Sequence, residues 1–162
     1  MRVMSIVKDS IVDGPGLRCT IFFAGCPHYC KGCHNPKSWN VKGGTEMAVE
    51  DIIEEVGRDP LNDITFSGGE PMTQMEELIP LAKEWKNRNK NIWCYTGFTW
   101  EELQEKYSDR FLELCKFLDV IVDGRFHLEE RDLSLVYKGS KNQRIIDCQK
   151  SILEDKVVLY CC

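Results

Sequence analysis

Short apolar runs alternate with amphipathic stretches along most of this chain. The runs 18–25 (RCTIFFAG) and 63–67 (DITFS) are rich in β-branched and aromatic residues, a composition typical of buried strands. Between them, the apolar residues of 48–57 recur at the spacing of one helix face: Val49, Ile52, Ile53 and Val56. Because strand, helix and strand follow one another, the pattern predicts parallel strands joined by right-handed helical crossovers.

A helix is also predicted directly after the second strand. Thr73 is placed as its N-cap, and Glu76 completes a capping box, a device that contributes about 1 kcal/mol. Pro80 lies within this stretch, and an interior proline removes a backbone hydrogen bond at a cost of about 3 kcal/mol. We therefore expect a kink or a late helix start at Pro80.

The second half of the chain continues the alternation. Residues 91–95 (NIWCY) and 120–122 (VIV) are predicted strands, and an Asp-Gly pair closes the second one. Between them a helix opens on a second capping box, 99–102, runs towards Leu118 and is interrupted near Ser108. Two further strands are expected at 133–146 and 157–160.

The length of the chain limits the fold to part of a barrel. A complete eightfold barrel takes about 250 residues, whereas this chain has 162. We therefore expect one domain, 1–162, built as an open, partial (β/α) barrel with a mostly parallel sheet. Within it, 1–17 is an N-terminal segment with an Asp-Gly-Pro-Gly turn, and the pattern leaves the tail 148–162 undetermined. Ligands of such sheets bind at the carboxyl ends of the strands.

Composition and charge narrow the class of protein. The net charge of −5 and the pI of about 5.3 argue against nucleic-acid binding. No apolar run reaches the roughly 20 residues that cross a bilayer, and the first residues lack the apolar core of a signal peptide. We expect no membrane partner and a cytoplasmic location. Nine cysteines are an odd number for a disulfide framework; packing thiols are expected at Cys19, Cys94, Cys115 and Cys148, and a terminal pair without assigned role at Cys161 and Cys162.

Three cysteines are concentrated directly after the first strand. Cys26, Cys30 and Cys33 have the spacing C-x3-C-x2-C, which lets one loop bind three irons of a 4Fe–4S cluster and leaves the fourth iron open. Three other interpretations compete. Zinc could use the cysteines with His28 or His34, and the last pair with His34 matches the C-x-x-C-H pattern of haem attachment. A thioredoxin-like C-x-x-C pair is the third. The spacing alone does not decide between them.

A second candidate site, Ser67-Gly68-Gly69-Glu70, follows the second strand. Glycines at this point let the backbone approach a ligand closely, and Glu70 could accept charge-assisted hydrogen bonds from a ligand ammonium group. Strand ends often carry glycine, so the turn alone is a weak indication. Its place one crossover after the cysteine loop strengthens it, because both motifs then meet at the same edge of a parallel sheet.

This combination resembles the radical S-adenosylmethionine superfamily, whose members have a C-x3-C-x2-C loop after the first barrel strand and a Gly-Gly-Glu turn after the second. Residues 13–18 (DGPGLR) and 33–39 (CHNPKSW) are similar to the glycyl-radical-enzyme activases within it. His28 and Gly32 make the loop C-x-H-x-C-x-G-C, similar to the activases of the anaerobic (class III) ribonucleotide reductase. The similarity continues in the segments 93–97 (WCYTG), 122–124 (VDG) and 138–144 (KGSKNQR).

The resemblance implies a mechanism and its partners. Cys26, Cys30 and Cys33 would hold a 4Fe–4S cluster whose electron cleaves S-adenosylmethionine. The 5′-deoxyadenosyl radical so formed would take a hydrogen from a backbone glycine of the large subunit of anaerobic ribonucleotide reductase. A low-potential flavodoxin or ferredoxin would supply the electron, and no side chain would act as general acid or base.

The resemblance also implies a set of binding residues. Contacts to S-adenosylmethionine are implied for Gly32, Cys33, His34, Ser67, Gly68, Gly69, Glu70 and Asp123. Asp13 and Arg18 would contact the incoming glycine loop, although a tight turn explains their segment almost as well, and a strand-terminal aspartate such as Asp123 is often a turn former. Gly32 replaces an aromatic residue that most of the superfamily carries, so the adenine contact is unassigned. Activation of another glycyl radical enzyme, another small radical enzyme, and a zinc-stabilised binding module are the alternatives.

Overall fold

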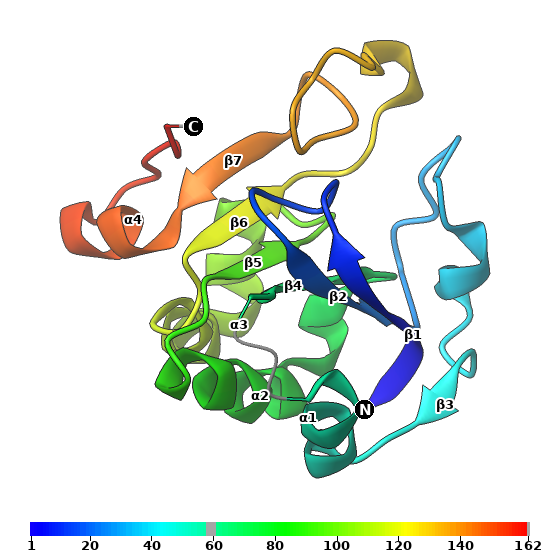
Figure 1. Ribbon diagram of the computed structural model, residues 1–162. Helices are drawn as coiled ribbons and strands as arrows, with labels where there is room; N and C mark the ends of the chain where they lie inside the picture. The colour runs from blue at the N-terminus through cyan, green and yellow to red at the C-terminus, as the bar shows by residue number, and fades with distance from the viewer. Residues whose placement is uncertain (58–60, 162) are drawn as a thin grey trace.

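A computed structural model describes residues 1–57 and 61–161 of the chain. Within this part the strands form one seven-stranded sheet in the order β3-β1-β2-β4-β5-β6-β7 (Figure 1). The strands are β1 (Arg2–Ser10), β2 (Arg18–Phe23), β3 (Thr45–Glu46), β4 (Asp63–Gly68), β5 (Ile92–Tyr95), β6 (Val120–Asp123) and β7 (Arg144–Asp147). The four neighbours β2, β4, β5 and β6 run parallel, whereas β1, β3 and β7 pair antiparallel at the two sides.

The longer helices gather on one side of this open sheet (Figure 1). They are α1 (Val49–Val56), α2 (Met75–Asn87) and α3 (Trp100–Cys115). Each lies between two parallel strands in the chain, as the predicted crossovers require. A fourth helix, α4 (Cys148–Glu154), follows β7 at the edge of the sheet. None of the helices in the described residues is both long enough and apolar enough to span a membrane. The expected mixed α/β architecture with an open sheet is confirmed.

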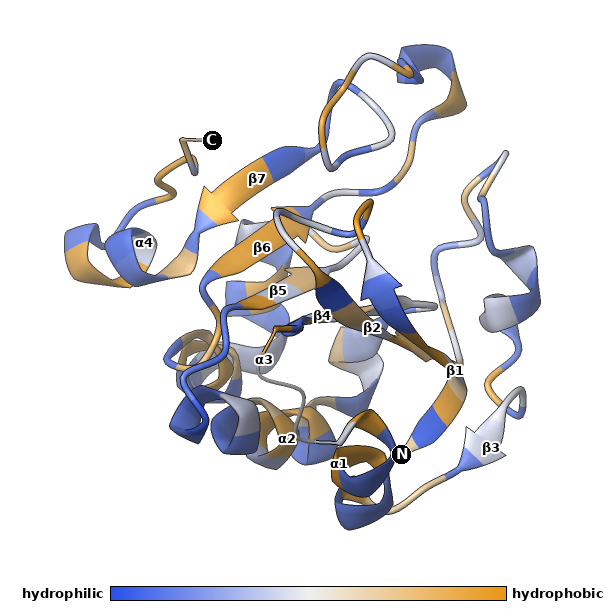
Figure 2. Cartoon of the chain, in the orientation of Figure 1, coloured by the Kyte–Doolittle hydropathy of each residue, from blue (hydrophilic) through white to orange (hydrophobic). Residues whose placement is uncertain are grey.

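Both faces of the sheet are apolar, because successive side chains of a strand point to opposite faces and both sets are largely hydrophobic. One set of strand side chains packs on the helices in the main core, as shown by Ile21, Phe66 and Ile121. The other set includes Trp93 and Val122, which form a second, smaller cluster. Parallel strands buried on both faces have nearly continuous apolar sequences, and most of β6 is coloured as hydrophobic in Figure 2.

Several predicted elements are confirmed in type and position. The strands predicted at 18–25, 63–67, 91–95 and 120–122 correspond to β2, β4, β5 and β6, and the helix at 48–57 corresponds to α1. Thr99 caps α3 in a complete capping box with Glu102. Ser108 has φ of 42° and ψ of −120° inside α3, which is the interruption expected there.

The predicted start of α2 is wrong. Thr73 lies in a short 3-10 turn, Pro71–Gln74, where its hydroxyl donates to the backbone oxygen of Glu70 at 2.7 Å, and α2 begins only at Met75. Pro80 neither delays nor ends the helix, which continues to Asn87. Tertiary burial offsets the missing hydrogen bond, because the apolar face of α2 is buried in the core through Leu78, Ile79, Leu81, Ala82 and Trp85.

The sequence pattern also failed at the two ends of the chain. The predicted strand 133–146 is formed only in its last part, as β7, and 157–160 contributes an isolated bridge between Leu159 and Ile146. The N-terminal segment contains β1, and the tail contains α4, neither of which was predicted. Polar residues dominate β1, because it lies between β2 and the two-residue strand β3 and much of it is exposed. Cys162 lies outside the described residues.

The capping box of α3 leads to a prediction about stability. Thr99 Oγ1 accepts the Glu102 backbone N–H at 3.2 Å, and Glu102 Oε2 accepts the Thr99 N–H at 2.9 Å. Thr99→Ala removes the first of these bonds and should lower the free energy of unfolding by about 1 kcal/mol. Chemical denaturation monitored by circular dichroism measures the change. Thr99→Ser, which keeps the hydroxyl, is the control, and an equal loss in both variants would contradict the capping explanation.

Candidate functional site

A cavity of about 450 Å³ lies at the carboxyl ends of the parallel strands. Small-molecule sites commonly have volumes of about 300–1,000 Å³. The wall of the cavity comes from the β1–β2 loop, the loop after β2, the ends of β4, β5 and β6, and the segment 135–143. Motifs that lie far apart in the sequence therefore meet at one place, as expected for the carboxyl edge of a parallel sheet.

The cysteine loop forms one side of this cavity. Cys26, Cys30 and Cys33 all line it as partly exposed, free thiols. Burial raises the pKa of Cys26, whereas a hydrogen bond from the backbone N–H of His28 opposes this rise by favouring the thiolate. Within the described part of the chain, no three His, Cys, Asp or Glu side chains are grouped closely enough to hold a metal ion. Three thiols that share one cavity are nevertheless the donor type that iron–sulfur clusters use.

The glycine turn after β4 lies against the start of the cysteine loop. Ser67, Gly68 and Gly69 line the cavity. A Cβ on Gly69 would lie 2.3 Å from the backbone oxygen of Gly25, and one on Gly68, which has φ of +104°, would lie 2.3 Å from the Phe23 nitrogen. Both positions therefore require glycine, because the two backbones approach too closely for any side chain.

Glu70 is buried behind the turn and bound to the protein itself. Its side chain is fully buried. Oε1 accepts hydrogen bonds from the Thr96 hydroxyl at 2.9 Å and the Met72 N–H at 3.1 Å, and Oε2 accepts from the Gly97 N–H at 2.8 Å. Oε2 also lies 2.7 Å from Nε2 of His28. Glu70 is not among the described residues that line the cavity. Its carboxylate thus has several protein donors, and the contact with a ligand ammonium group stays a prediction.

Aromatic and apolar residues face the cysteine loop from the segment after β6. A Cβ on Gly32, which has φ of +77°, would lie 2.9 Å from Cδ1 of Leu128. A larger residue at this position would therefore be both strained and crowded. His34 and Phe126 line the cavity, and their rings meet edge to face with centroids 5.5 Å apart. The sequence analysis missed Phe126 and Leu128, because neither belongs to a recognisable motif.

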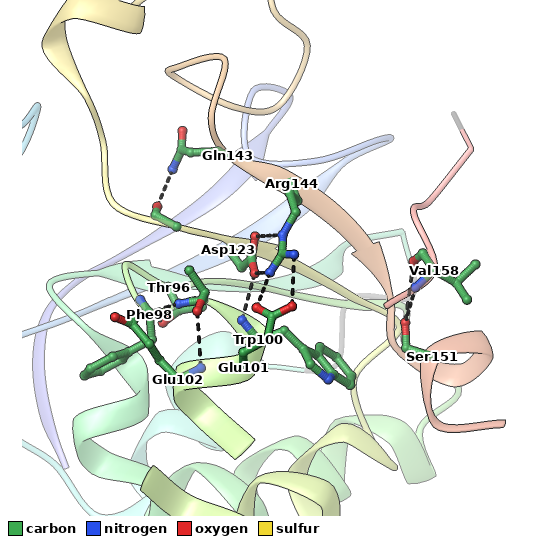
Figure 3. A network of polar contacts seen from close by, with 12 residues as sticks. Thr96, Phe98, Trp100, Glu101, Glu102, Asp123, Gln143, Arg144, Ser151 and Val158 are labelled. Carbon is green, nitrogen blue, oxygen red and sulfur yellow. Dashed lines mark hydrogen bonds and ion pairs between the residues drawn. The ribbon is translucent and has the colours of Figure 1, made fainter. Parts of the chain in front are cut away.

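Asp123 is bonded inside the protein and is not one of the described residues that line the cavity. Figure 3 shows Arg144 between Asp123 and Glu101. Arg144 Nε donates to Asp123 Oδ1 at 3.0 Å, and the Trp100 N–H donates to Oδ2 at 2.8 Å. The hydrogen bonds to Asp123 and Glu101 raise the pKa of Arg144, and the bond to Arg144 lowers the pKa of Glu101. Asp123 thus ties β7 to the start of α3, and its contact with the cofactor stays a prediction.

Asp13 is on the wall of the cavity. Its Oδ2 accepts hydrogen bonds from the hydroxyls of Ser10 at 2.6 Å and Thr20 at 3.0 Å. Its backbone oxygen accepts the Thr65 hydroxyl at 2.8 Å. These bonds hold the Asp-Gly-Pro-Gly turn against β2 and β4, and they present Asp13 to the cavity.

Arg18 is fully buried, and its guanidinium binds backbone and side-chain acceptors of the protein. Nε donates to the Thr65 hydroxyl at 2.6 Å, and Nη2 donates to the backbone oxygens of Ile64 at 2.7 Å and Asn91 at 3.0 Å. The guanidinium carbon lies 5.6 Å from the centre of the Trp93 ring. Burial lowers the pKa of Arg18. The donors of Arg18 thus hold strand ends together, and its contact with a partner stays a prediction.

Two tyrosines complete the wall opposite the cysteine loop. The Tyr95 hydroxyl donates to the backbone oxygen of Tyr137 at 3.0 Å, and both residues line the cavity. Burial raises the pKa of Tyr95, so the phenol remains protonated at neutral pH. In the sequence, Tyr95 was marked only because its segment, 93–97 (WCYTG), is similar to the activases. No sequence feature marked Tyr137.

Comparison with known proteins shows which family the sequence resembles. The family model described as "4Fe-4S single cluster domain" matches residues 12–146. A protein from Haemophilus influenzae, named anaerobic ribonucleoside-triphosphate reductase-activating protein, is 35% identical over 156 residues, which cover 90% of this chain and 97% of the relative.

Two further relatives carry the same name. The one from Enterobacteria phage T4 is 34% identical over 154 residues, or 90% of this chain and 93% of the relative. The one from Escherichia coli K12 is 34% identical over 142 residues, or 82% of this chain and 90% of the relative. The matches thus extend over nearly the full length on both sides.

Proposed function

This chain belongs to the family of anaerobic ribonucleoside-triphosphate reductase-activating proteins, and from that premise we propose that it activates an anaerobic ribonucleotide reductase by radical S-adenosylmethionine chemistry. The observation that carries this proposal is the shared cavity. Three thiols from the loop after β2 and the glycine turn after β4 form its wall together. The family description favours an iron–sulfur cluster over the zinc and haem interpretations of the same loop.

The residues present suit the two groups that this function requires. Cys26, Cys30 and Cys33 would hold the cluster, because thiolates are the usual ligands of iron–sulfur clusters. The partly exposed turn at Gly68 and Gly69 would bind the amino-acid end of S-adenosylmethionine. When both are bound, they supply the one-electron chemistry that removes a hydrogen atom from a carbon.

The chain itself binds, orients and shields the reacting groups. The open sheet with its longer helices on one side is interpreted as a partial barrel of the radical S-adenosylmethionine type. Phe22, Trp39 and Phe126 supply apolar surface to the cavity wall, which excludes water from a reactive radical. The proposed reaction needs no side chain as general acid or base.

The partner would be the large reductase subunit, whose glycine segment must reach the cavity. Val12 lines the cavity and is 72% exposed, its neighbour Ile11 is 69% exposed, and Asp13 follows them on the wall. Val136 is 59% exposed in the segment after β6. These side chains would give the partner apolar surface beside the cavity. A low-potential flavodoxin or ferredoxin is the proposed electron donor.

An anaerobic radical assay tests the proposal. The protein, reconstituted with iron and sulfide, is incubated with S-adenosylmethionine, a reductant and the large subunit of an anaerobic ribonucleotide reductase. A glycyl radical signal in electron paramagnetic resonance is the expected result. Silence with this partner and a signal with another glycyl radical enzyme would show a different target. A colourless protein that binds zinc and takes up no iron would support a zinc-stabilised binding module.

The wall formed by Phe126 leads to a prediction about cofactor binding. We propose that the ring of Phe126, next to His34, provides the aromatic contact to adenine that Gly32 lacks. Stacking on a base contributes about 1–3 kcal/mol. Phe126→Ala should therefore weaken the binding of S-adenosylmethionine about fivefold to tenfold, or more. Equilibrium dialysis with the reconstituted protein measures this. Leu133→Ala, on the same segment at a side chain that is 84% exposed, is the matched control. Equal affinities of the two variants would contradict the assignment.

A further inference from the structure

We propose that His28 is a positioning residue: its side-chain bond to Glu70 fixes the cysteine loop, so that backbone N–H groups of the loop keep their direction towards the cysteine sulfurs and set the reduction potential of the cluster. This inference rests on the proposed function, since it concerns a cluster bound by the cysteine loop. The bond joins two positions 42 residues apart, with 2.7 Å between Nε2 and Oε2. Because a carboxylate only accepts hydrogen bonds, Nε2 is the nitrogen that carries the hydrogen.

The side chain of His28 fits a closely built slot. It is only 4% exposed. A Cβ on Gly97 would lie 2.3 Å from Cδ2 of His28, so the ring lies against a backbone that has no side chain. The ring of Phe98 meets the imidazole edge to face, with centroids 4.5 Å apart. A histidine in a loop between two proposed ligands would be expected to face solvent, and here it is enclosed on several sides.

The acceptor of this bond is itself immobilised. Glu70 also accepts hydrogen bonds from Met72, Thr96 and Gly97, which belong to the segments following β4 and β5. The imidazole of His28 therefore connects the loop after β2 to the ends of two neighbouring strands. The loop is fixed at its middle by a fully buried carboxylate and does not depend on its backbone alone.

The consequence for the cluster follows from the position of His28 between Cys26 and Cys30. A backbone N–H of this loop donates to a cysteine sulfur, from Asn35 to Sγ of Cys33 at 3.4 Å. Hydrogen bonds to the sulfurs are among the features that set the reduction potential of iron–sulfur clusters. Such a bond stabilises the more negative, reduced state. If the side chain of His28 is released, the N–H groups of the loop lose their fixed direction, and the potential should become more negative.

Three variants test the proposal. His28→Phe keeps an aromatic ring in the slot and removes the bond to Glu70, whereas His28→Gln keeps a side-chain donor. Glu70→Gln alters the bond from the other side. The matched control is His127→Phe, because Nδ1 of His127 also contacts a glutamate, Glu130 at 2.9 Å, but on the surface.

The readouts are iron content, the midpoint potential from a redox titration, and the electron paramagnetic resonance spectrum of the reduced protein. In the expected result, His28→Phe and Glu70→Gln bind iron with a more negative potential and a changed spectrum. His28→Gln should lie between them and the wild type, and His127→Phe should equal the wild type. The double variant of His28→Phe with Glu70→Gln should shift no further than the larger single shift, because both changes break one contact.

The outcomes distinguish a failure of the proposed function from a failure of the role of His28. Wild-type protein that takes up no iron would refute the proposed function itself. Variants that bind iron with unchanged potential and spectrum would overturn the role of His28. A variant that keeps its circular dichroism spectrum but fails to bind iron, where His127→Phe binds it normally, supports the role, since the loop then no longer presents its thiols. If one variant fails to fold, the remaining two decide by the same criteria.

Discussion

Cys30→Ala should lower the bound iron from about four atoms per chain to nearly none and abolish formation of the glycyl radical on the reductase. Cys30 lines the cavity on a loop and is partly exposed, so its removal leaves no hole in the packed core. A cluster held by three thiolates has no spare ligand in the proposed set. The stability of the apoprotein should therefore change by less than about 0.5 kcal/mol.

The other cysteines provide matched controls for this experiment. Cys148 is fully buried in the core beside Cys115, and burial raises its pKa, so it packs as a thiol. Cys148→Ala should keep the iron and lower the free energy of unfolding by about 1–2 kcal/mol. Cys161 is exposed, and Cys161→Ala should change neither property. Colorimetric iron analysis after reconstitution and urea denaturation measure the two effects. Full iron content in Cys30→Ala would refute the ligand assignment.

Arg18→Ala should be strongly destabilising, with a loss of about 3–5 kcal/mol in the free energy of unfolding. The side chain is fully buried, and its loss leaves buried acceptors without a donor, among them the Thr65 hydroxyl and the backbone oxygens of Ile64 and Asn91. Each unsatisfied buried polar group costs about 1–3 kcal/mol. Since domains of this size are stable by roughly 5–15 kcal/mol, the variant should be close to unfolding.

The experiment also distinguishes the two roles considered for Arg18. Arg125, whose side chain is 42% exposed and bound to Glu102 at 3.1 Å, is the control, and Arg125→Ala should cost less than about 0.5 kcal/mol. Arg18→Lys keeps the charge but cannot donate in a fork, so it should also be clearly destabilised. Urea denaturation measures all three variants. If Arg18→Lys kept full stability and lost only activation of the reductase, the predicted contact with the partner would be supported instead.

Much of the fold could be predicted because its causes are local. The strands 63–67, 91–95 and 120–122 are short segments rich in β-branched and aromatic residues, the composition typical of buried strands. The capping box of α3 and the interruption at Ser108 were likewise confirmed, since capping depends on residues three positions apart. Local rules failed at Thr73, and the alternative of a late start at Pro80 was wrong, because packing of α2 in the core prevailed over propensity.

The candidate site was also predicted in part from the sequence, where its causes are local. The spacing of the cysteines and the glycine turn identified residues that line one cavity, because both follow parallel strands and must meet at one edge. The sequence did not reveal the protein partners of the charged side chains. Glu70, Asp123 and Arg18 were assigned to ligands or partners, and the structure shows that each of them also has partners within the protein.

The sequence by itself determined the order of the parallel strands and of the helices between them, the edge at which the chemistry gathers and, with its relatives, the family. These features depend on periodicity and on spacing within a few residues. Only the tertiary structure decided which charged groups face the cavity. His28 meets Glu70 across 42 positions and Arg18 meets Asn91 across 73, and such pairs exist only after the strands have assembled. A buried charge must find its partners somewhere in the fold, and sequence distance does not reveal where.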